Sequence, residues 1–192
     1  NYEFNYSKIN NQAVKEAKGE YIVLLNNDTE IITPHWLQIM VGYAMQPHIG
    51  AVGTKLLYPD NTVQHAGIIL GIGGIAQHCF IDNPRDDVGF YGRLSVPFNY
   101  SAVTAACLMV SKEKYLEVNG LEEDLQVAFN DVDFNLKLLK QGYYNICLNH
   151  VELYHHESKS RGDDTVDTSS AKYRRFVQEH DYIKDKWGYM LY

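Results

Sequence analysis

The stretch YIVLLNNDTEI, residues 21–31, holds an apolar run that ends abruptly in two asparagines and a carboxylate. Such a short apolar run is typical of a strand buried in a sheet, and we expect that strand over residues 20–25. A turn alone could explain Asn26, Asn27 and Asp28, because such side chains often serve the local backbone. The sharper interpretation is that Asp28 offers an anionic oxygen to a divalent cation from a rigid element.

The sequence around this stretch predicts strands that alternate with helices. Such an alternation indicates an α/β fold with at least some parallel strands. Ligands of these sheets gather at the carboxyl ends of strands, which is where Asp28 is expected. Residues 71–97 are rich in Gly, Asp and Pro and predict a long loop. We expect helices over residues 7–18, 33–45 and 131–141, a short helix after Ser111 and a last helix near the end, and strands over 50–58, 63–70, 103–110, 143–148 and 151–155.

Composition sets bounds on the class of protein. The 192 residues fit one domain that can bury a core, and the net charge of -7 argues against nucleic acid as a main partner. The three cysteines form no CxxC pair, which favours a reducing compartment, the cytosol. We expect neither a secretory signal nor a transmembrane helix, because the longest weakly polar run, residues 66–76, falls short of the roughly 20 residues needed. Contact with a membrane surface is left open.

The segment FNDVDFNLKLLKQG, residues 129–142, reads as a helix with acids in its first turn. Asn130 as N-cap with Asp133 three residues later is similar to a capping box, which explains both without any function. Asp131 is explained less well, and residues 131 and 133 do not share a helix face. A carboxylate at a helix entrance that faces a cleft suits a general base, so Asp131 is the candidate.

The segment ELYHHESKSRGDD, residues 152–164, brings two adjacent histidines. Near a strand end they point to opposite faces, so at most one serves a given site. His155 is favoured over His156 because it alternates with Val151 and Leu153. A neutral imidazole would complement Asp28 around a divalent ion. The following polar segment, with Arg161, is a solvated loop in the simplest interpretation. The resemblance described next implies the alternative, a lid whose cations close over a diphosphate.

These segments together resemble family 2 glycosyltransferases with the GT-A fold, most of all bacterial enzymes that elongate cell-surface polysaccharides, some of them rhamnosyltransferases. The resemblance runs through nearly the whole chain, in NYSKINNQAVKEAKGEYIVLLNNDTEI, GAVGTKLLYPDNTVQHAGIILGIGGIAQH, VTAACLMVSKEKYLEVNGLEEDLQVAFNDVDFNLKLLKQGY and ELYHHESKSRG. It implies a Rossmann-like, mixed and mostly parallel sheet flanked by helices. It also implies that residues 1–192 are one partial GT-A domain without its N-terminal nucleotide-binding strands, ending in a loop and helix over 156–192.

The resemblance also implies roles for individual residues. Asn26-Asn27-Asp28 matches the DxD-type motif, so Asp28 would bind Mn²⁺ or Mg²⁺ and Asn27 would lie at the donor. Asp131 matches the general base, and one of His155 and His156 matches a histidine that approaches the metal. The implied reaction is an inverting transfer from a UDP- or dTDP-sugar to a hydroxyl of a glycan or polyprenyl-linked acceptor. It would take place in the cytoplasm, at the inner face of the plasma membrane.

The sequence departs from the family pattern at three motif positions. NND has one carboxylate where DxD has two, Asn130 replaces the usual Glu, and Ala105 replaces a frequent Gly. Two other interpretations therefore stay open. One is a glycosyltransferase-like binding module without turnover. The other is a metal hydrolase built on two acids and two histidines, namely Asp131, Asp133, His155 and His156.

Overall fold

The structure, a computed structural model, describes residues 4–156 and 167–191. Its α-helices are α1 (Tyr6–Glu16), α2 (Trp36–Ala44), α3 (Lys112–Glu117), α4 (Asn130–Lys140) and α5 (Ala171–Trp187). Its strands are β1 (Tyr21–Leu25), β2 (Thr29–Ile31), β3 (Ile49–Leu57), β4 (Val63–His65), β5 (Ile68–Leu70), β6 (Ala76–His78), β7 (Pro97–Tyr100), β8 (Cys107–Ser111) and β9 (Tyr144–His155). The short 3₁₀ turns are η1 (Ile72–Gly74), η2 (Phe90–Gly92) and η3 (Gly188–Met190).

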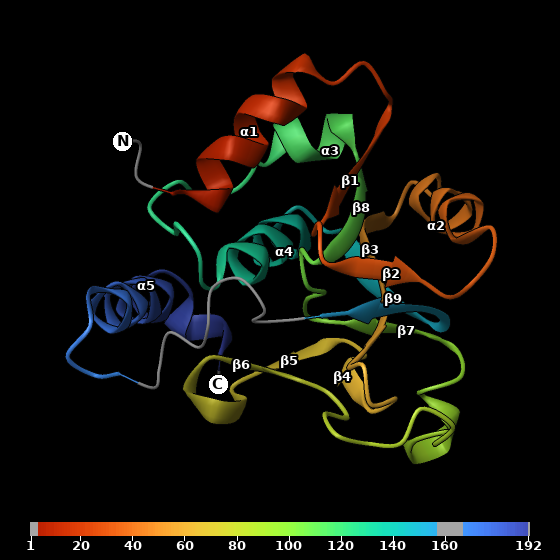
Figure 1. Cartoon of the computed structure of the whole chain (residues 1–192). Coiled ribbons are helices and arrows are strands. Elements are labelled where there is room, and N and C mark those ends of the chain that lie inside the picture. Colours follow the sequence, from red (N-terminus) through yellow and green to blue (C-terminus); the bar gives the residue numbers. More distant parts are fainter. Residues whose placement is uncertain (1–3, 157–166, 192) are drawn as a thin grey trace.

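Within the described residues, a seven-stranded mixed sheet forms the centre of the molecule (Figure 1). Its path runs β1-β8-β3-β9-β2, with β4 added beside β3 and β7 beside β9. The pair β3–β9 is parallel, whereas β8 runs antiparallel to both β1 and β3. The α/β class is as predicted. The expectation of a mostly parallel sheet is wrong for the described residues, because β8 separates the strands that would be parallel and the short strands β2, β4 and β7 also pair antiparallel.

Helices cover both faces of the sheet, and this explains the uninterrupted apolar run of β1. Ile22 and Leu24 belong to the core cluster that includes residues of α1, α3 and α4. Tyr21 and Val23 pack from β1 against the cluster that includes α2. A strand covered on both faces is apolar at every position, whatever the direction of its neighbours.

The segment expected as one strand over residues 63–70 is divided into β4 and β5. Gly67 lies at the division with φ 112°, a value that L side chains rarely adopt. A Cβ atom there would lie 2.3 Å from the ring of Tyr100, so the close approach of that ring also requires glycine. The prediction of one long loop over residues 71–97 was partly wrong. Strand β6 pairs with β5 as a hairpin, and the 3₁₀ turns η1 and η2 also lie in this range. Strand β7 was missed.

Two helices begin differently from the prediction. Asn5 caps α1, while Ser7, the first residue of the predicted helix, is buried and donates a hydrogen bond to the carbonyl of Leu125. Helix α2 begins after His35, whose backbone is left-handed with φ 58°. The hydroxyl of Thr33, the first residue of the predicted helix, accepts from the backbone N–H of Glu152 at 2.8 Å and does not cap α2. A cap residue has several backbone donors within reach, and tertiary contacts decided between them.

The last elements of the described chain are longer and less regular than expected. The strands predicted over 143–148 and 151–155 are one strand, β9, with a register shift against β3. The predicted last helix is α5, which buries Glu179, Ile183 and Trp187 and leaves Val177 exposed. The carboxylate of Glu179 accepts backbone N–H bonds from three successive residues before α4. No helix in residues 4–156 or 167–191 is long and apolar enough to cross a membrane.

Candidate active site

Asp28 and His155 meet at the edge of the sheet. Asp28 follows β1 and immediately precedes β2, which pairs antiparallel with the end of β9 so that Thr29 lies opposite His155. The Oδ1 atom of Asp28 lies 3.2 Å from Nε2 of His155. The side-chain nitrogen of Asn26 lies 3.1 Å from the same imidazole nitrogen. The polar turn after β1 therefore contacts the histidine at the end of β9 as well as forming local hydrogen bonds.

The ring of His155 is oriented by Gln64 on β4. Nδ1 of His155 lies 2.7 Å from Oε1 of Gln64, and the Gln64 amide nitrogen donates to the His155 carbonyl at 3.5 Å. An amide oxygen can only accept, so Nδ1 carries the proton. In the neutral ring Nε2 then presents its lone pair toward Asn26 and Asp28.

This arrangement fits a divalent cation. Oδ1 of Asp28 is buried and has no hydrogen-bond donor among the described residues, and its neighbour Nε2 is also an acceptor. Two acceptors so close together repel unless a proton or a cation lies at them. Carboxylate oxygen and imidazole nitrogen suit Mn²⁺, and the Asn26 amide would have to yield its place on Nε2. No group of three or more metal-ligating side chains occurs in the described part of the chain, so further ligands would come from a bound molecule or water.

The other predicted donor-site residues lie apart from this pair. His156 turns toward Glu30, with Nε2 3.4 Å from Oε2, and its backbone N–H donates to the Asp28 carbonyl at 2.9 Å. Asn27 is exposed at the turn. Arg161 lies outside the described residues. The structure thus brings together Asp28 and His155, as the alternation along β9 predicted, but not His156.

Asp131 lies in the first turn of α4, with its carboxylate held by two backbone N–H groups. Oδ1 accepts from Val132 at 2.8 Å and Oδ2 from Ala105 at 3.1 Å. The predicted capping box is wrong, because the N-cap is Phe129, with φ 59°, and the Asn130 side chain donates to a preceding carbonyl. The first turn of α4 instead directs the Asp131 carboxylate toward the backbone of the segment before β8.

The segment 104–106 connects Asp131 with the Asp28–His155 pair. The backbone N–H of Asn26 donates to the carbonyl of Ala106 at 3.0 Å, and that of Ala105 donates to Asp131. The neighbouring N–H of Thr104 lies 3.4 Å from Nε2 of His65. One short stretch of backbone is thus hydrogen-bonded both to the candidate base and to the turn that carries the candidate metal ligand Asp28.

Asp133 has a structural role that differs from the predicted one. It is fully buried, and Oδ1 accepts from the indole N–H of Trp187 at 2.8 Å and from Lys186 at 2.9 Å. Oδ2 forms an ion pair with Lys137 at 3.1 Å. Asp133 therefore joins α4 to α5 and neither caps a helix nor faces the site. The alternative of a metal hydrolase needed Asp133 as one of its four metal ligands, and Asp133 is buried between α4 and α5 instead.

Sequence reasoning missed the polar layer behind His155, which consists of Gln64, His65 and His78. His65 is fully buried, and burial holds its pKa well below the ordinary value, with smaller contributions from His78 and His155. The ring of His78 packs edge-on against the ring of His65, with 4.7 Å between the ring centroids. The sequence did hold a signal for this layer, the polar pair Gln64-His65 inside an apolar run. Polar side chains buried in such a run need hydrogen-bond partners, which predicts other polar groups beside them.

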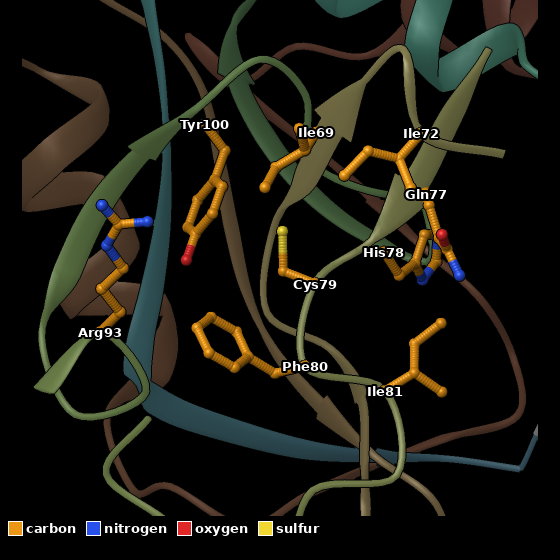
Figure 2. A pocket seen from close by; sticks show the side chains of 9 residues that line it. All are labelled: Ile69, Ile72, Gln77, His78, Cys79, Phe80, Ile81, Arg93 and Tyr100. Carbon is orange, nitrogen blue, oxygen red and sulfur yellow. The ribbon is translucent and has the colours of Figure 1, made fainter. Parts of the chain in front are cut away.

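A mostly apolar cavity of about 390 Å³ adjoins this layer at His78 (Figure 2). It lies between the β5–β6 hairpin and β7. Burial raises the pKa of the Cys79 thiol to about 11, so this lining cysteine is neutral. All three cysteines are buried thiols. The lining side chains are Ile69, Ile72, Gln77, His78, Cys79, Phe80, Ile81, Arg93 and Tyr100.

Comparison with known proteins places this chain in a family. The family model described as glycosyl transferase family 2 matches residues 3–110, more than half of the chain. The chain belongs to this family. It is 47% identical over 185 residues to y4gI of Sinorhizobium fredii, an uncharacterized protein, covering 96% of this chain and 20% of that protein. It is 41% identical over 172 residues to the O-antigen biosynthesis protein RfbC of Myxococcus xanthus, covering 86% of this chain and 13% of that protein.

Solved structures agree on the fold. GalNAc-T7, solved with UDP, GalNAc and Mn²⁺, superposes with a TM-score of 0.65 at 12% identity, covering 92% of this chain and 34% of that chain. The mannosyltransferase PcManGT of Pyrobaculum calidifontis, solved with GDP-Man and Mn²⁺, gives 0.59 at 18% identity, covering 96% and 44%. The chain has the GT-A fold, as the resemblance implied. It spans less than half the length of each of these four proteins.

Proposed function

We propose that this chain carries the metal and base side of the active site of an inverting glycosyltransferase that uses a nucleotide-sugar donor. The observation that carries the proposal is the distance of 3.2 Å between Nε2 of His155 and Oδ1 of Asp28, a buried oxygen to which no group of the described residues donates a hydrogen bond. Membership of glycosyl transferase family 2 supports the reaction class. Two fold neighbours, which were solved with a nucleotide or nucleotide sugar and Mn²⁺, support the ligand class.

Asp28 and His155 would hold Mn²⁺ or Mg²⁺, with the imidazole favouring Mn²⁺. When bound, the cation supplies positive charge that stabilises a departing nucleoside diphosphate. His156 has no place in this set, because its ring turns to Glu30. Asn27 would contact the donor from the exposed turn. Arg161, outside the described residues, is proposed to contact the diphosphate.

Asp131 would act as the general base. The two backbone donors on its carboxylate fix its direction, and each oxygen keeps a lone pair for a proton. The carboxylate takes the proton of an acceptor hydroxyl as that oxygen attacks the anomeric carbon. The bond from that carbon to the diphosphate oxygen breaks in the same displacement, so the configuration inverts. Segment 104–106 would hold Asp131 at a fixed position relative to Asp28, through its hydrogen bonds to Asp131 and to Asn26.

The biological setting follows from the relatives and remains part of the proposal. The likeness to RfbC, an O-antigen biosynthesis protein, supports a role in surface polysaccharide synthesis. The donor would be a UDP- or dTDP-sugar and the acceptor a glycan or a polyprenyl-linked glycan. Sugar nucleotides of this kind and three buried thiols suit the cytoplasm, with peripheral contact at the inner face of the plasma membrane.

The test uses the complete natural protein and a panel of UDP- and dTDP-sugars with Mn²⁺. Release of nucleoside diphosphate should depend on the cation, stop in excess chelator and return when Mn²⁺ is restored. Full turnover in chelator would contradict the metal assignment. Tight donor binding without any turnover, measured by calorimetry across the panel, would instead support a binding module.

A further inference from the structure

We infer that Gln64 is a positioning residue that selects the tautomer of His155 and so turns Nε2 into a metal ligand. The inference rests on the proposed metal role of Asp28 and His155 and adds a residue to which none of the comparisons assigns a role. Gln64 lies on β4, far from the DxD-type turn in sequence, and is 3% exposed. Its side-chain oxygen lies 2.7 Å from Nδ1 of His155.

The choice of tautomer matters because Asp28 competes for the same ring. A carboxylate 3.2 Å from Nε2 favours a proton on that nitrogen, which would give a simple His155–Asp28 hydrogen bond. That bond would occupy both the lone pair of Nε2 and an oxygen of Asp28. Because the oxygen of Gln64 holds the proton on Nδ1, the lone pair of Nε2 and the oxygen of Asp28 can both bind a cation once the Asn26 amide moves off Nε2.

Gln64 can do this because its own position is fixed on several sides. Its amide nitrogen donates to the His155 carbonyl at 3.5 Å, which orients the amide group. Its backbone carbonyl lies 3.2 Å from Nδ1 of His78, and the ring of His78 packs on buried His65. Strand β4 also pairs with β3, with His65 opposite Leu56. A side chain held this way is preorganised, which a tautomer-selecting residue requires.

The experiment compares Mn²⁺ binding in the complete natural protein by electron paramagnetic resonance, with UDP as the added probe. Gln64→Leu keeps the bulk but removes the acceptor and should weaken Mn²⁺ binding about 10- to 100-fold, the usual effect of losing such an outer partner. Gln64→Glu keeps an acceptor on Nδ1 and should stay within about threefold of wild type. Gln77→Leu makes the same replacement at an exposed position of β6 and should change nothing.

A second measurement needs no metal and no turnover. In ¹⁵N-histidine-labelled, metal-free protein, the His155 signals should report a proton on Nδ1 in wild type and Gln64→Glu. In Gln64→Leu the proton should move to Nε2. The His155→Gln spectrum assigns the signals, and the melting temperature of each variant confirms folding.

The outcomes separate this inference from the proposed function. Should Asp28→Ala abolish Mn²⁺ binding while Gln64→Leu binds like wild type, the Gln64 inference is wrong and the metal site stands. Should a folded Gln64→Glu lose Mn²⁺ as fully as Gln64→Leu, bulk or packing rather than an acceptor is needed, and the inference is also wrong. Should Asp28→Ala bind Mn²⁺ normally, the proposed metal site itself fails, whatever Gln64 does.

Discussion

The Nε2 atom of His155 lies 3.2 Å from Oδ1 of Asp28 because β2 and β9 pair antiparallel in one register, with Thr29 opposite His155. Side chains alternate along a strand, so a slip by one residue would present His156 in place of His155. In the register that forms, His156 turns to Glu30. The register of a three-residue strand therefore decides which histidine faces the carboxylate.

The first prediction contrasts these two histidines. His155→Asn in the complete protein should weaken Mn²⁺ binding in the presence of UDP and cut turnover by at least about 10²-fold, since a direct ligand is lost. His156→Asn is the matched control and should stay within about threefold of wild type, because its ring turns to an exposed glutamate and not to Asp28. Manganese titration and donor turnover check both. Equal losses in the two variants would contradict the proposed ligand set.

The second prediction concerns Asp131. Asp131→Asn should lower kcat by about 10²- to 10⁴-fold, because the amide still packs but cannot take a proton. The affinity for the donor should barely change, since the carboxylate contacts backbone N–H groups and not the Asp28–His155 pair. Steady-state kinetics and calorimetry with the donor separate the two effects. Donor affinity that falls as far as kcat would show that Asp131 serves binding.

The third prediction concerns Asp133, two residues away. Asp133→Asn should lower the free energy of unfolding by about 3 kcal/mol, because the partly buried Lys137 and Lys186 both lose the charge of the fully buried Asp133 carboxylate. Turnover per folded molecule should change little. Urea denaturation measures the loss, and Asp131→Asn is the comparison, expected to stay within about 1 kcal/mol of wild type. A catalytic defect in folded Asp133→Asn with normal stability would reverse the two assignments.

The sequence predicted what depends on local pattern. The strand before Asn26, the strand over 50–58 and the short helix after Ser111 were confirmed. Burial on both faces makes a strand apolar throughout, and a serine that caps a helix is a local signal. The interpretation of Asp133 failed because acids in a first turn look alike whether they cap the helix or enter a core. Gln64 was missed because its partner is His155, ninety-one positions along the chain, and only tertiary pairing of β4 and β9 around β3 brings them together.

The last prediction concerns a partly buried ionic cluster around Glu152 of β9, three residues before His155. Glu152 lies 2.7 Å from Lys55 and 2.8 Å from Arg85, and its side chain is 16% exposed. Burial alone would raise the pKa of Glu152, but the hydrogen bonds from Lys55 and Arg85 outweigh it and lower the pKa. A carboxyl whose pKa is lower in the folded state adds stability above its unfolded pKa, about 4.3. That stability is lost as the pH falls through the folded pKa.

Glu152→Gln should therefore be less stable than wild type at pH 7, by about 2 kcal/mol, the usual worth of hydrogen bonds to a charged group. The difference should shrink as the pH falls below about 4.3, since protonation removes the same charge from wild type. Urea unfolding measured from pH 7 to the acid limit of folding gives the curve. Glu16→Gln, an exposed helix position, is the control and should follow wild type throughout. A difference between Glu152→Gln and wild type that stays constant down to the lowest pH would show that packing, not charge, holds Glu152 in place.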